Sequence, residues 1–236
     1  MKNKQAKIIR EIVRQNNLRN LLELGTYQGK GTAYMAAILE ERRGPGTVTT
    51  FDREKCLELS PNVNEVITTM GLEHRVKINL HHRSFTFPLM KMLEANPRPQ
   101  FDFCYFDGGH TWDETGFAFL LVDKLLKPGA WIILDDLDWT IWESEKKRGK
   151  IINRSYSDEE KKIKQVRKVW EILVKEADYI NMRENEFGWG IAQKPYSKNM
   201  VMHNFYNTKY RFRKRLAKYK NKTSRALKKK AKKILR

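Results

Sequence analysis

Short apolar runs alternate along the chain with segments whose apolar residues recur at helical spacing. Short runs bounded by turn residues are typical of strands buried on both faces, and the longer segments are typical of amphipathic helices. This alternation predicts an α/β fold with a mostly parallel sheet, right-handed crossovers and helices on both faces. The expected strands are 21–24, 47–51, 76–80 and the runs that end before Asp107 and Asp135; the expected helices are 6–13, 32–42, 61–70, 88–95, the segment that stops at 127–129, and 158–176.

Two more strands are expected after the last of these helices. Residues 179–183 and 187–193 have strand-like composition, and a tight turn at 184–186 joins them. The pair would close the sheet as an antiparallel C-terminal hairpin. The complete prediction is therefore a seven-stranded, mostly parallel sheet with one antiparallel edge.

Positive charge is concentrated at the C-terminal end of the chain. The 236 residues contain 47 Lys and Arg against 28 Asp and Glu, which gives a net charge of +19. Residues 194–236 hold 17 of the basic residues and no acidic residue, so the preceding part is nearly neutral. This change in composition predicts a folded domain over residues 1–194 and a basic C-terminal extension over residues 195–236.

Aromatic residues are interleaved with the basic residues of this extension, a composition that suits a polyanionic partner. Leu216, Leu227, Ala231 and Ile234 can share part of a helical face, so an interfacial helix on an anionic membrane surface is one interpretation. Nucleic acid is the second, through counterion release and base stacking. A solvated helical or disordered tail that only aids solubility is the third.

The composition also bears on the cellular location. Cys56 and Cys104 show no zinc-site or disulfide spacing, and the N-terminal segment is too charged for a signal peptide. No apolar run approaches the ~18 residues that a membrane span requires. We therefore expect a cytoplasmic protein that is at most peripheral at the inner membrane surface.

A glycine-rich turn follows the first expected strand. In LLELGTYQGKGT, Glu23 is followed by Gly25, Gly29 and Gly31, where backbone without Cβ atoms lets a ligand approach closely. The spacing differs from GxGxxG, and the longer turn suits a ligand other than a dinucleotide pyrophosphate. Asp52 follows the next expected strand, where a carboxylate can accept both hydroxyls of a ribose. These residues predict a nucleotide-type ligand site.

These features resemble a class I S-adenosylmethionine-dependent methyltransferase over residues 5–194. The family's glycine motif reads acid, x, Gly, x, x, x, Gly, which Glu23, Gly25 and Gly29 match, and its ribose-binding acid corresponds to Asp52. The resemblance implies a Rossmann-like sheet with strand order 3, 2, 1, 4, 5, 7, 6 and S-adenosylmethionine as the cofactor, with its adenine near Arg83. The cofactor-binding residues that it implies are Glu23, Gly25, Thr26, Tyr27, Gly29, Asp52, Arg53, Ser84, Phe85 and Asp107.

Three carboxylates close two neighbouring apolar runs, and strand ends of this kind are where α/β folds keep their sites. Asp107 closes the first run, and Asp135 and Asp136 close the second, with Asp138 as a further acid in the same loop. Their positions are similar to those of the metal ligands in the divalent-cation-dependent O-methyltransferases of antibiotic sugars and in the cephalosporin hydroxylase-like group. That resemblance implies that Asp107, Asp135 and Asp136 bind Mg²⁺, which would lower the pKa of the acceptor hydroxyl. The alternative is metal-free: Asp107 contacts cofactor or substrate, and Asp135 or Asp136 caps a loop.

His110 lies three residues after Asp107, in the segment DGGHTW. Its near-neutral titration suits a general base, and DGGH resembles the DGxH motif of a broad group of these methyltransferases. We expect His110 and Asp107 to be the catalytic residues; the alternative for His110 is a helix cap. Trp112, Trp139 and Trp142 follow the strand ends and are expected to wall an acceptor pocket, with core or lid packing as the alternative.

The function that these features favour is methylation of a hydroxyl group on a small molecule or sugar, assisted by Mg²⁺. One alternative is an RNA methyltransferase whose basic extension contacts the phosphate backbone. Another is a non-catalytic cofactor-binding module that the extension tethers to an anionic surface. The chain lacks an NPPY-type motif of amino-group methylation, and the sequence indicates no oligomeric state.

Overall fold

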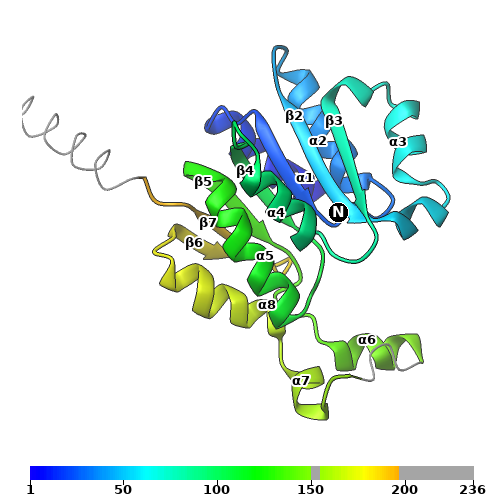
Figure 1. Cartoon of the computed structure of the whole chain (residues 1–236), viewed down its shortest axis with the longest axis vertical. Coiled ribbons are helices and arrows are strands. Elements are labelled where there is room, and N and C mark those ends of the chain that lie inside the picture. The colour runs from blue at the N-terminus through cyan, green and yellow to red at the C-terminus, as the bar shows by residue number, and fades with distance from the viewer. Residues whose placement is uncertain (150–154, 197–236) are drawn as a thin grey trace, which may run out of the picture. The chain divides into compact units, whose positions relative to one another are not determined.

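A seven-stranded sheet forms the centre of the protein (Figure 1). The computed structural model describes residues 1–149 and 155–196. The strands are β1 (Asn20–Leu24), β2 (Thr47–Arg53), β3 (Val76–His81), β4 (Phe101–Phe106), β5 (Leu126–Leu134), β6 (Ile180–Glu184) and β7 (Gly190–Gln193). Their order is β3-β2-β1-β4-β5-β7-β6, and only β7 runs antiparallel to its neighbours. This order confirms the Rossmann-like α/β fold with an antiparallel C-terminal hairpin.

Helices cover both faces of the sheet (Figure 1). One face packs against α1 (Asn3–Gln15), α2 (Lys30–Glu41) and α3 (Val63–Thr69). The other packs against α4 (Thr86–Glu94), α5 (Trp112–Leu125), α8 (Gln165–Lys168) and the π-helical η3 (Val169–Val174). The connections contain the short helices η1 (Glu54–Glu58), η2 (Glu73–Arg75), α6 (Ile141–Arg148) and α7 (Asp158–Lys162).

The sheet separates two hydrophobic clusters because successive residues of a strand point to opposite faces. On β4, Cys104 and Phe106 pack in the cluster beneath α4 and α5, while Phe103 and Tyr105 pack in the cluster beneath α1 and α2. All four are at most 2% exposed. A strand that is buried on both faces must be apolar at consecutive positions, which is why β4 reads as an unbroken apolar run.

The carboxyl ends of the central strands meet at one edge of the sheet. The amides of Gly25, Asp107 and Asp135 donate to carbonyl oxygens at the ends of β2, β1 and β4, each at 2.8 Å. Backbone hydrogen bonding therefore continues one residue beyond β1, β4 and β5. As a result, the glycine turn and the carboxylates lie next to one another.

The segment 158–176, expected as one helix, is divided in the structure. α7 ends before Ile163, which is extended (φ −73°, ψ 137°), and α8 begins at Gln165. The side-chain Oε1 of Gln165 accepts a hydrogen bond from the backbone N–H of Trp112 at 2.7 Å, and its Nε2 donates to the carbonyl of Glu160 at 2.9 Å. This contact with the start of α5 overrides the local helical spacing.

The loop between β5 and α7, where the sequence predicts no helix, contains the helix α6. The hydroxyl of Thr140 accepts a hydrogen bond from the Glu143 N–H at 3.1 Å, and Gly149 ends the helix with a left-handed φ of 64°. Within α6 only Ile141 is buried. A helix with one buried residue has no apolar periodicity that the sequence could reveal.

The boundary between α5 and β5 also differs from the expectation. The helix was expected to stop at residues 127–129, but α5 ends at Leu125 and β5 begins at Leu126. Gly129 lies in the strand, and its N–H donates to the carbonyl of Lys194 at 3.1 Å. The register between β4 and β5 shifts at this end, which accommodates Pro128 within the strand.

The contacts along the chain divide it into Met1–Pro195 and Tyr196–Arg236. The interpretations of the basic extension concern residues that, from 197 onward, lie outside the described part. The division into domains at residue 194 therefore stays a prediction. Within residues 1–149 and 155–196, no helix combines the length and apolar character that a membrane crossing requires.

Candidate functional site

The turn after β1 presses its backbone against the residue that follows β4. Gly25 has a φ of 99°, and a Cβ atom placed on it would lie 2.1 Å from the carbonyl oxygen of Asp107. Gly29 is the N-cap of α2, has a φ of 85°, and leaves only 2.8 Å between such a Cβ and the side chain of Val63. Both glycines are therefore needed to form the turn, whatever ligand it binds.

Asp52 braces the same turn from the end of β2. Its Oδ2 accepts hydrogen bonds from the backbone N–H groups of Thr26 at 2.8 Å and Tyr27 at 2.6 Å. Its Oδ1 accepts from the N–H of Arg53 at 2.7 Å. Because a carboxylate offers about four acceptor positions, Oδ1 keeps one that a ribose hydroxyl could use.

A cavity of about 1340 Å³ lies at this edge of the sheet. Nine of the ten predicted cofactor residues line it. The exception is Gly29, which is buried beneath the turn, while its neighbours Lys30 and Gly31 line the cavity. Because sites for one small ligand are typically about 300–1,000 Å³, the cavity has room for a donor and an acceptor together.

Glu23 lies at the buried side of the cavity and is 1% exposed. Its Oε2 accepts hydrogen bonds from the hydroxyls of Thr32 and Thr50. Burial raises the pKa of Glu23 to about 8, although the two hydrogen bonds act in the opposite direction. A cationic ligand group beside this side chain would lower the pKa and favour the carboxylate.

Asp107, His110 and Asp136 form a polar cluster in the cavity. One potential ligand atom from each residue lies within 4.8 Å of the other two, and the distance from His110 Nε2 to Asp136 Oδ2 is 2.8 Å. Both His110 (φ 56°) and Asp136 (φ 58°) have left-handed backbone conformations. Such conformations cost about 1–3 kcal/mol in residues other than glycine, so the surrounding fold must hold them.

Asp135 has a different environment from its neighbour Asp136. It accepts a hydrogen bond from the hydroxyl of Tyr105, and its Oδ1 accepts from the N–H of Asp136 at 2.7 Å. Asp135 does not line the cavity, whereas Asp107 and Asp136 do. The geometry therefore offers His110, in place of Asp135, as a third ligand, and the expected metal set of Asp107, Asp135 and Asp136 stays a prediction.

The acidic residues of this region shift one another's pKa values because they are buried together. Burial, followed by the charges of Asp135 and Asp136, raises the pKa of Asp107 to about 7. Burial likewise raises the pKa of Asp135, against the hydrogen bond from Tyr105. Burial alone would lower the pKa of His110, but the hydrogen bond with Asp136 and the surrounding negative charges outweigh it, so this pKa is raised. A bound cation would relieve the repulsion among the carboxylates.

Residues of α6 and its flanks form a wall of the cavity. Trp139, Ile141, Arg148 and Tyr156 line it. The ring centroids of His110 and Trp139 are 5.1 Å apart, so the indole lies beside the candidate base. This wall follows β5, two strands from the glycine turn that follows β1 and on the opposite side from β2 and β3.

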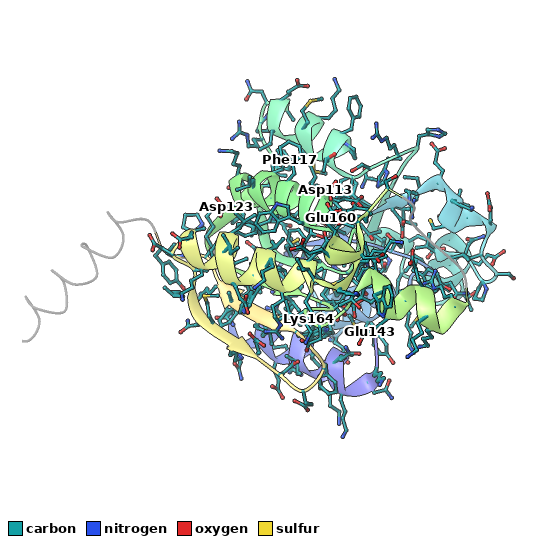
Figure 2. The ribbon with its side chains drawn as sticks, turned by 90° about the horizontal axis from the view of Figure 1, so that it is seen from below. Asp113, Phe117, Asp123, Glu143, Glu160 and Lys164 are labelled. Atoms are coloured by element: carbon teal, nitrogen blue, oxygen red, sulfur yellow. The ribbon has the colours of Figure 1, made fainter. Side chains whose placement is uncertain are left out.

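Contacts with α7 hold α6 in place. The Nζ of Lys161 lies 3.1 Å from Glu145 Oε2, and the two side chains are only 10% and 12% exposed. The Nζ of Lys162 lies 4.8 Å from the centre of the Trp142 ring. Figure 2 shows the two helices, with Glu143 labelled on α6 and Glu160 on α7. The wall is therefore anchored by its own set of interactions.

The three tryptophans expected to wall the pocket have different positions. Trp139 lines the cavity, whereas Trp112 and Trp142 do not. Trp112 begins α5 and is 41% exposed, and Trp142 is 44% exposed beneath Lys162. The packing alternative therefore fits Trp142 better than a place in the pocket.

Sequence reasoning missed several residues that line the cavity, among them Lys30, Arg148 and Tyr156. Lys30 and Arg148 are single basic residues near helix ends, and such residues are too common to indicate a site. His81 also lines the cavity and was not among the predicted site residues. The structure places His81 in β3, where burial lowers its pKa and neither ring nitrogen has a hydrogen-bond partner in the described part of the chain.

The fold and the cavity define a Rossmann-like protein with a nucleoside-type site at the carboxyl edge of its sheet. Residues 22–137 match a family model described as a methyltransferase domain. None of the curated proteins matches the chain. The match covers just under half of the chain, and together with the fold it bears out the resemblance to the class I S-adenosylmethionine-dependent methyltransferases.

Solved methyltransferases have the same fold. An O-methyltransferase from Bacillus cereus, solved with S-adenosylhomocysteine, has a TM-score of 0.59 and 22% identity, and the match covers 82% of this chain and 80% of that chain. The O-methyltransferase TomG from Streptomyces achromogenes is involved in tomaymycin synthesis and was solved with S-adenosylmethionine. It has a TM-score of 0.60 and 18% identity, and the match covers 83% of this chain and 81% of that chain. At these identities the likeness shows the fold.

Proposed function

We propose that the protein transfers the methyl group of S-adenosylmethionine to a hydroxyl group of a small molecule or sugar. The observation that carries this proposal is the cluster of Asp107, His110 and Asp136, which shares one cavity with the glycine turn and Asp52. A candidate base and two carboxylates beside a donor site suit removal of a hydroxyl proton. The names of the structural neighbours, which are O-methyltransferases, support the same reaction.

In this proposal the residues around the glycine turn hold the donor. Asp52 accepts a ribose hydroxyl through Oδ1, Glu23 faces the amino end of the donor, and Ser84 and Phe85 lie beside the adenine. The close approach of the Gly25 backbone to Asp107 and the half-buried Asp52 carboxylate fit such a ligand. When bound, the donor supplies a methyl group on a good leaving group, so the protein must align the acceptor more than activate the methyl group.

His110 is the proposed general base. With its Nε2–H donated to Asp136, its Nδ1 is free to accept a proton from the acceptor hydroxyl. Asp136 holds the ring in that tautomer and stabilises the imidazolium that forms. Asp107 contributes a second negative charge beside the ring, which also favours the protonated imidazole.

A divalent cation such as Mg²⁺ is the proposed assistant, held by Asp107 and Asp136. Two carboxylates and an imidazole suit a hard or borderline divalent cation, and the three side chains already approach one another closely. When bound, the cation polarises the acceptor oxygen as a Lewis acid. With the cation bound, His110 would be a third ligand, and the cation rather than His110 would activate the hydroxyl. Asp135 supports the loop through its hydrogen bond with the Asp136 amide.

Calorimetry with S-adenosylhomocysteine, with and without Mg²⁺, tests both parts of the proposal. The matched variants are Asp136→Asn and Asp138→Asn; Asp138 is 54% exposed, does not line the cavity, and pairs with Lys164 at 2.9 Å. We expect S-adenosylhomocysteine to bind all three proteins and Mg²⁺ to bind the wild type and Asp138→Asn only. Absence of S-adenosylhomocysteine binding would contradict the methyltransferase, whereas cofactor binding with no response to Mg²⁺ would remove the cation and leave His110 as the base.

The basic extension supports the remaining alternatives for the partner. RNA binding that weakens steeply with salt and disappears on removal of residues 195–236 would favour an RNA acceptor. Binding to anionic vesicles would favour a membrane surface. Tight S-adenosylhomocysteine binding without turnover of any hydroxyl acceptor would favour the non-catalytic module.

A further inference from the structure

Three arginines that line the cavity make no side-chain hydrogen bond or ion pair with the residues that the structure describes. They are Arg53, Arg83 and Arg148. All three are exposed: Arg53 is the last residue of β2, Arg83 follows β3, and Arg148 ends α6 after β5. Most arginines elsewhere in the described chain have partners: Arg10, Arg75 and Arg167 pair with carboxylates, and Arg19, Arg42 and Arg98 donate to backbone carbonyls.

The position of Arg148 follows from the anchored wall described above. It ends α6, which the buried pair of Glu145 and Lys161 holds against α7. Lys146 and Lys147 also lie in the last turn, where the helix dipole favours cations, but neither lines the cavity. The dipole therefore accounts for the basic character of this turn, but it does not explain why the arginine is the residue that lines the cavity.

The carboxylates of the cavity are engaged by other groups. Asp52 accepts from the glycine turn, and Asp113 accepts a hydrogen bond from the hydroxyl of Tyr156 at 3.2 Å. Figure 2 labels Asp113 near the start of α5. Arg53 and Glu114 line the same cavity; burial raises the pKa of Glu114, and the charge of Arg53 opposes this rise. Once a cationic donor and a divalent ion balance the buried carboxylates, these arginines and Lys30 are the cavity's cationic side chains without a partner among the described residues.

We propose that the acceptor carries an anionic group, a phosphate or a carboxylate, which Arg148 binds, while Arg53 and Arg83 contribute positive charge from the β2 and β3 side. This inference rests on the proposed methyl transfer, because it assigns a second group to the same acceptor. A guanidinium binds carboxylate and phosphate oxygens in a bidentate geometry that water and lysine do not reproduce.

The donor offers a competing explanation, since its amino-acid end carries a carboxylate that an arginine could bind. The experiment therefore uses protein already saturated with S-adenosylhomocysteine, which carries the same carboxylate. Any anion site that remains in the loaded protein belongs to the acceptor. An anion that displaces S-adenosylhomocysteine would instead assign the arginines to the donor and overturn the proposal.

Calorimetry on the loaded full-length chain tests the inference, with inorganic pyrophosphate and citrate as probes at fixed ionic strength. The variants are Arg148→Gln and Lys147→Gln, which remove one positive charge from adjacent positions of the same helical turn. We expect Arg148→Gln to bind the preferred probe about tenfold more weakly, as loss of a charge-assisted hydrogen bond predicts, and Lys147→Gln to bind it as the wild type does. Arg148→Lys, which keeps the charge without the planar fork, should recover only part of the affinity.

Each outcome has one meaning. Stronger binding of pyrophosphate identifies a phosphate group on the acceptor, and stronger binding of citrate identifies a carboxylate. Equal weakening in Arg148→Gln and Lys147→Gln, or no weakening in either, would overturn the inference, because anion binding would then reflect overall charge. Absence of S-adenosylhomocysteine binding to the wild type would instead refute the proposed function. This result would be seen in the first titration, before either probe is added.

Discussion

Replacing Lys161 by Met tests whether α6 is a fixed wall of the acceptor site. Lys161 pairs with Glu145 at 3.1 Å, and both side chains are nearly buried, at 10% and 12% exposure. Met has a similar length and no charge, so Lys161→Met leaves the Glu145 carboxylate without this partner. Removing one partner of a buried ion pair typically costs about 3–5 kcal/mol.

The expected effect is local rather than global. Glu145 makes a further interaction, which places the cost near the lower end, about 3 kcal/mol. A domain is usually stable by about 5–15 kcal/mol, so the sheet stays folded and α6 opens more often. At about 1.4 kcal/mol per tenfold change, the opening equilibrium of α6 should rise by roughly a hundredfold.

Hydrogen exchange measures this opening directly. Backbone amides of residues 141–148 should exchange roughly a hundredfold faster in Lys161→Met, whereas those of β1 and β4 should keep their protection. S-adenosylhomocysteine affinity should not change, because the residues proposed to hold the donor lie on the other side of the cavity. When a methylated acceptor has been identified, its KM should rise in Lys161→Met by a larger factor than kcat falls.

Lys162→Met is the matched control, since the Nζ of Lys162 lies 4.8 Å from the centre of the Trp142 ring, and Trp142 is exposed. Such a contact contributes about 0.5–1 kcal/mol at an exposed site, so exchange in α6 should change only a few fold. The double variant Glu145→Gln with Lys161→Met should recover much of the protection, because no buried charge is left. Equal exchange in the two single variants would refute the assignment of the Glu145 and Lys161 pair as the anchor of α6.

Three further predictions concern the donor side and the carboxylates. Gly25→Ala should abolish S-adenosylhomocysteine binding, because the new Cβ would overlap the Asp107 carbonyl. The control Gly71→Ala, at φ 64° with no atom within 4 Å of the new Cβ, should lose only about 1 kcal/mol of stability and keep binding. Calorimetry and thermal melting of both variants check this. Asp52→Ala removes the acceptor of three backbone N–H groups and should weaken S-adenosylhomocysteine binding by at least about tenfold, so an unchanged affinity would contradict the placement of the ribose. Burial and neighbouring carboxylates raise the pKa of Asp107 to about 7 in the folded protein, above the value of about 3.9 for a free Asp. The folded, ligand-free protein therefore binds this proton more tightly than the unfolded chain does. The stability that results is present at low pH and is lost as the pH rises through 7. The melting temperature of the ligand-free protein should therefore fall between about pH 5 and pH 8, and Asp107→Asn should reduce the slope; a slope equal to that of the wild type would contradict the raised pKa.

Local hydrophobic patterns were enough to predict the sheet and its helices. A parallel strand buried on both faces must be apolar at successive positions, so β1 and β4 are visible as continuous runs. The strand order followed from the resemblance rather than from the pattern. The pattern failed at Ile163, where a side-chain contact between Gln165 and the start of α5 interrupts the helix.

The site could be predicted only as far as strand ends are visible in the sequence. Asp52 and Asp107 were found because carboxylates that end parallel strands gather at one edge. The different environments of Asp135 and Asp136 were not predictable, because they depend on the left-handed turn at Asp136 and on the hydroxyl of Tyr105 across the sheet.

The sequence by itself determined the alternation of strands and helices and the glycine turn, since each depends on neighbouring residues in the chain. The tertiary structure alone decided that His110 faces Asp136 and that α6 brings Arg148 to the cavity. Both arrangements depend on contacts between residues far apart in sequence. Periodicity along the chain carries no information about such contacts, because the direction of a side chain that leaves a strand is set by the backbone angles and the packing around it.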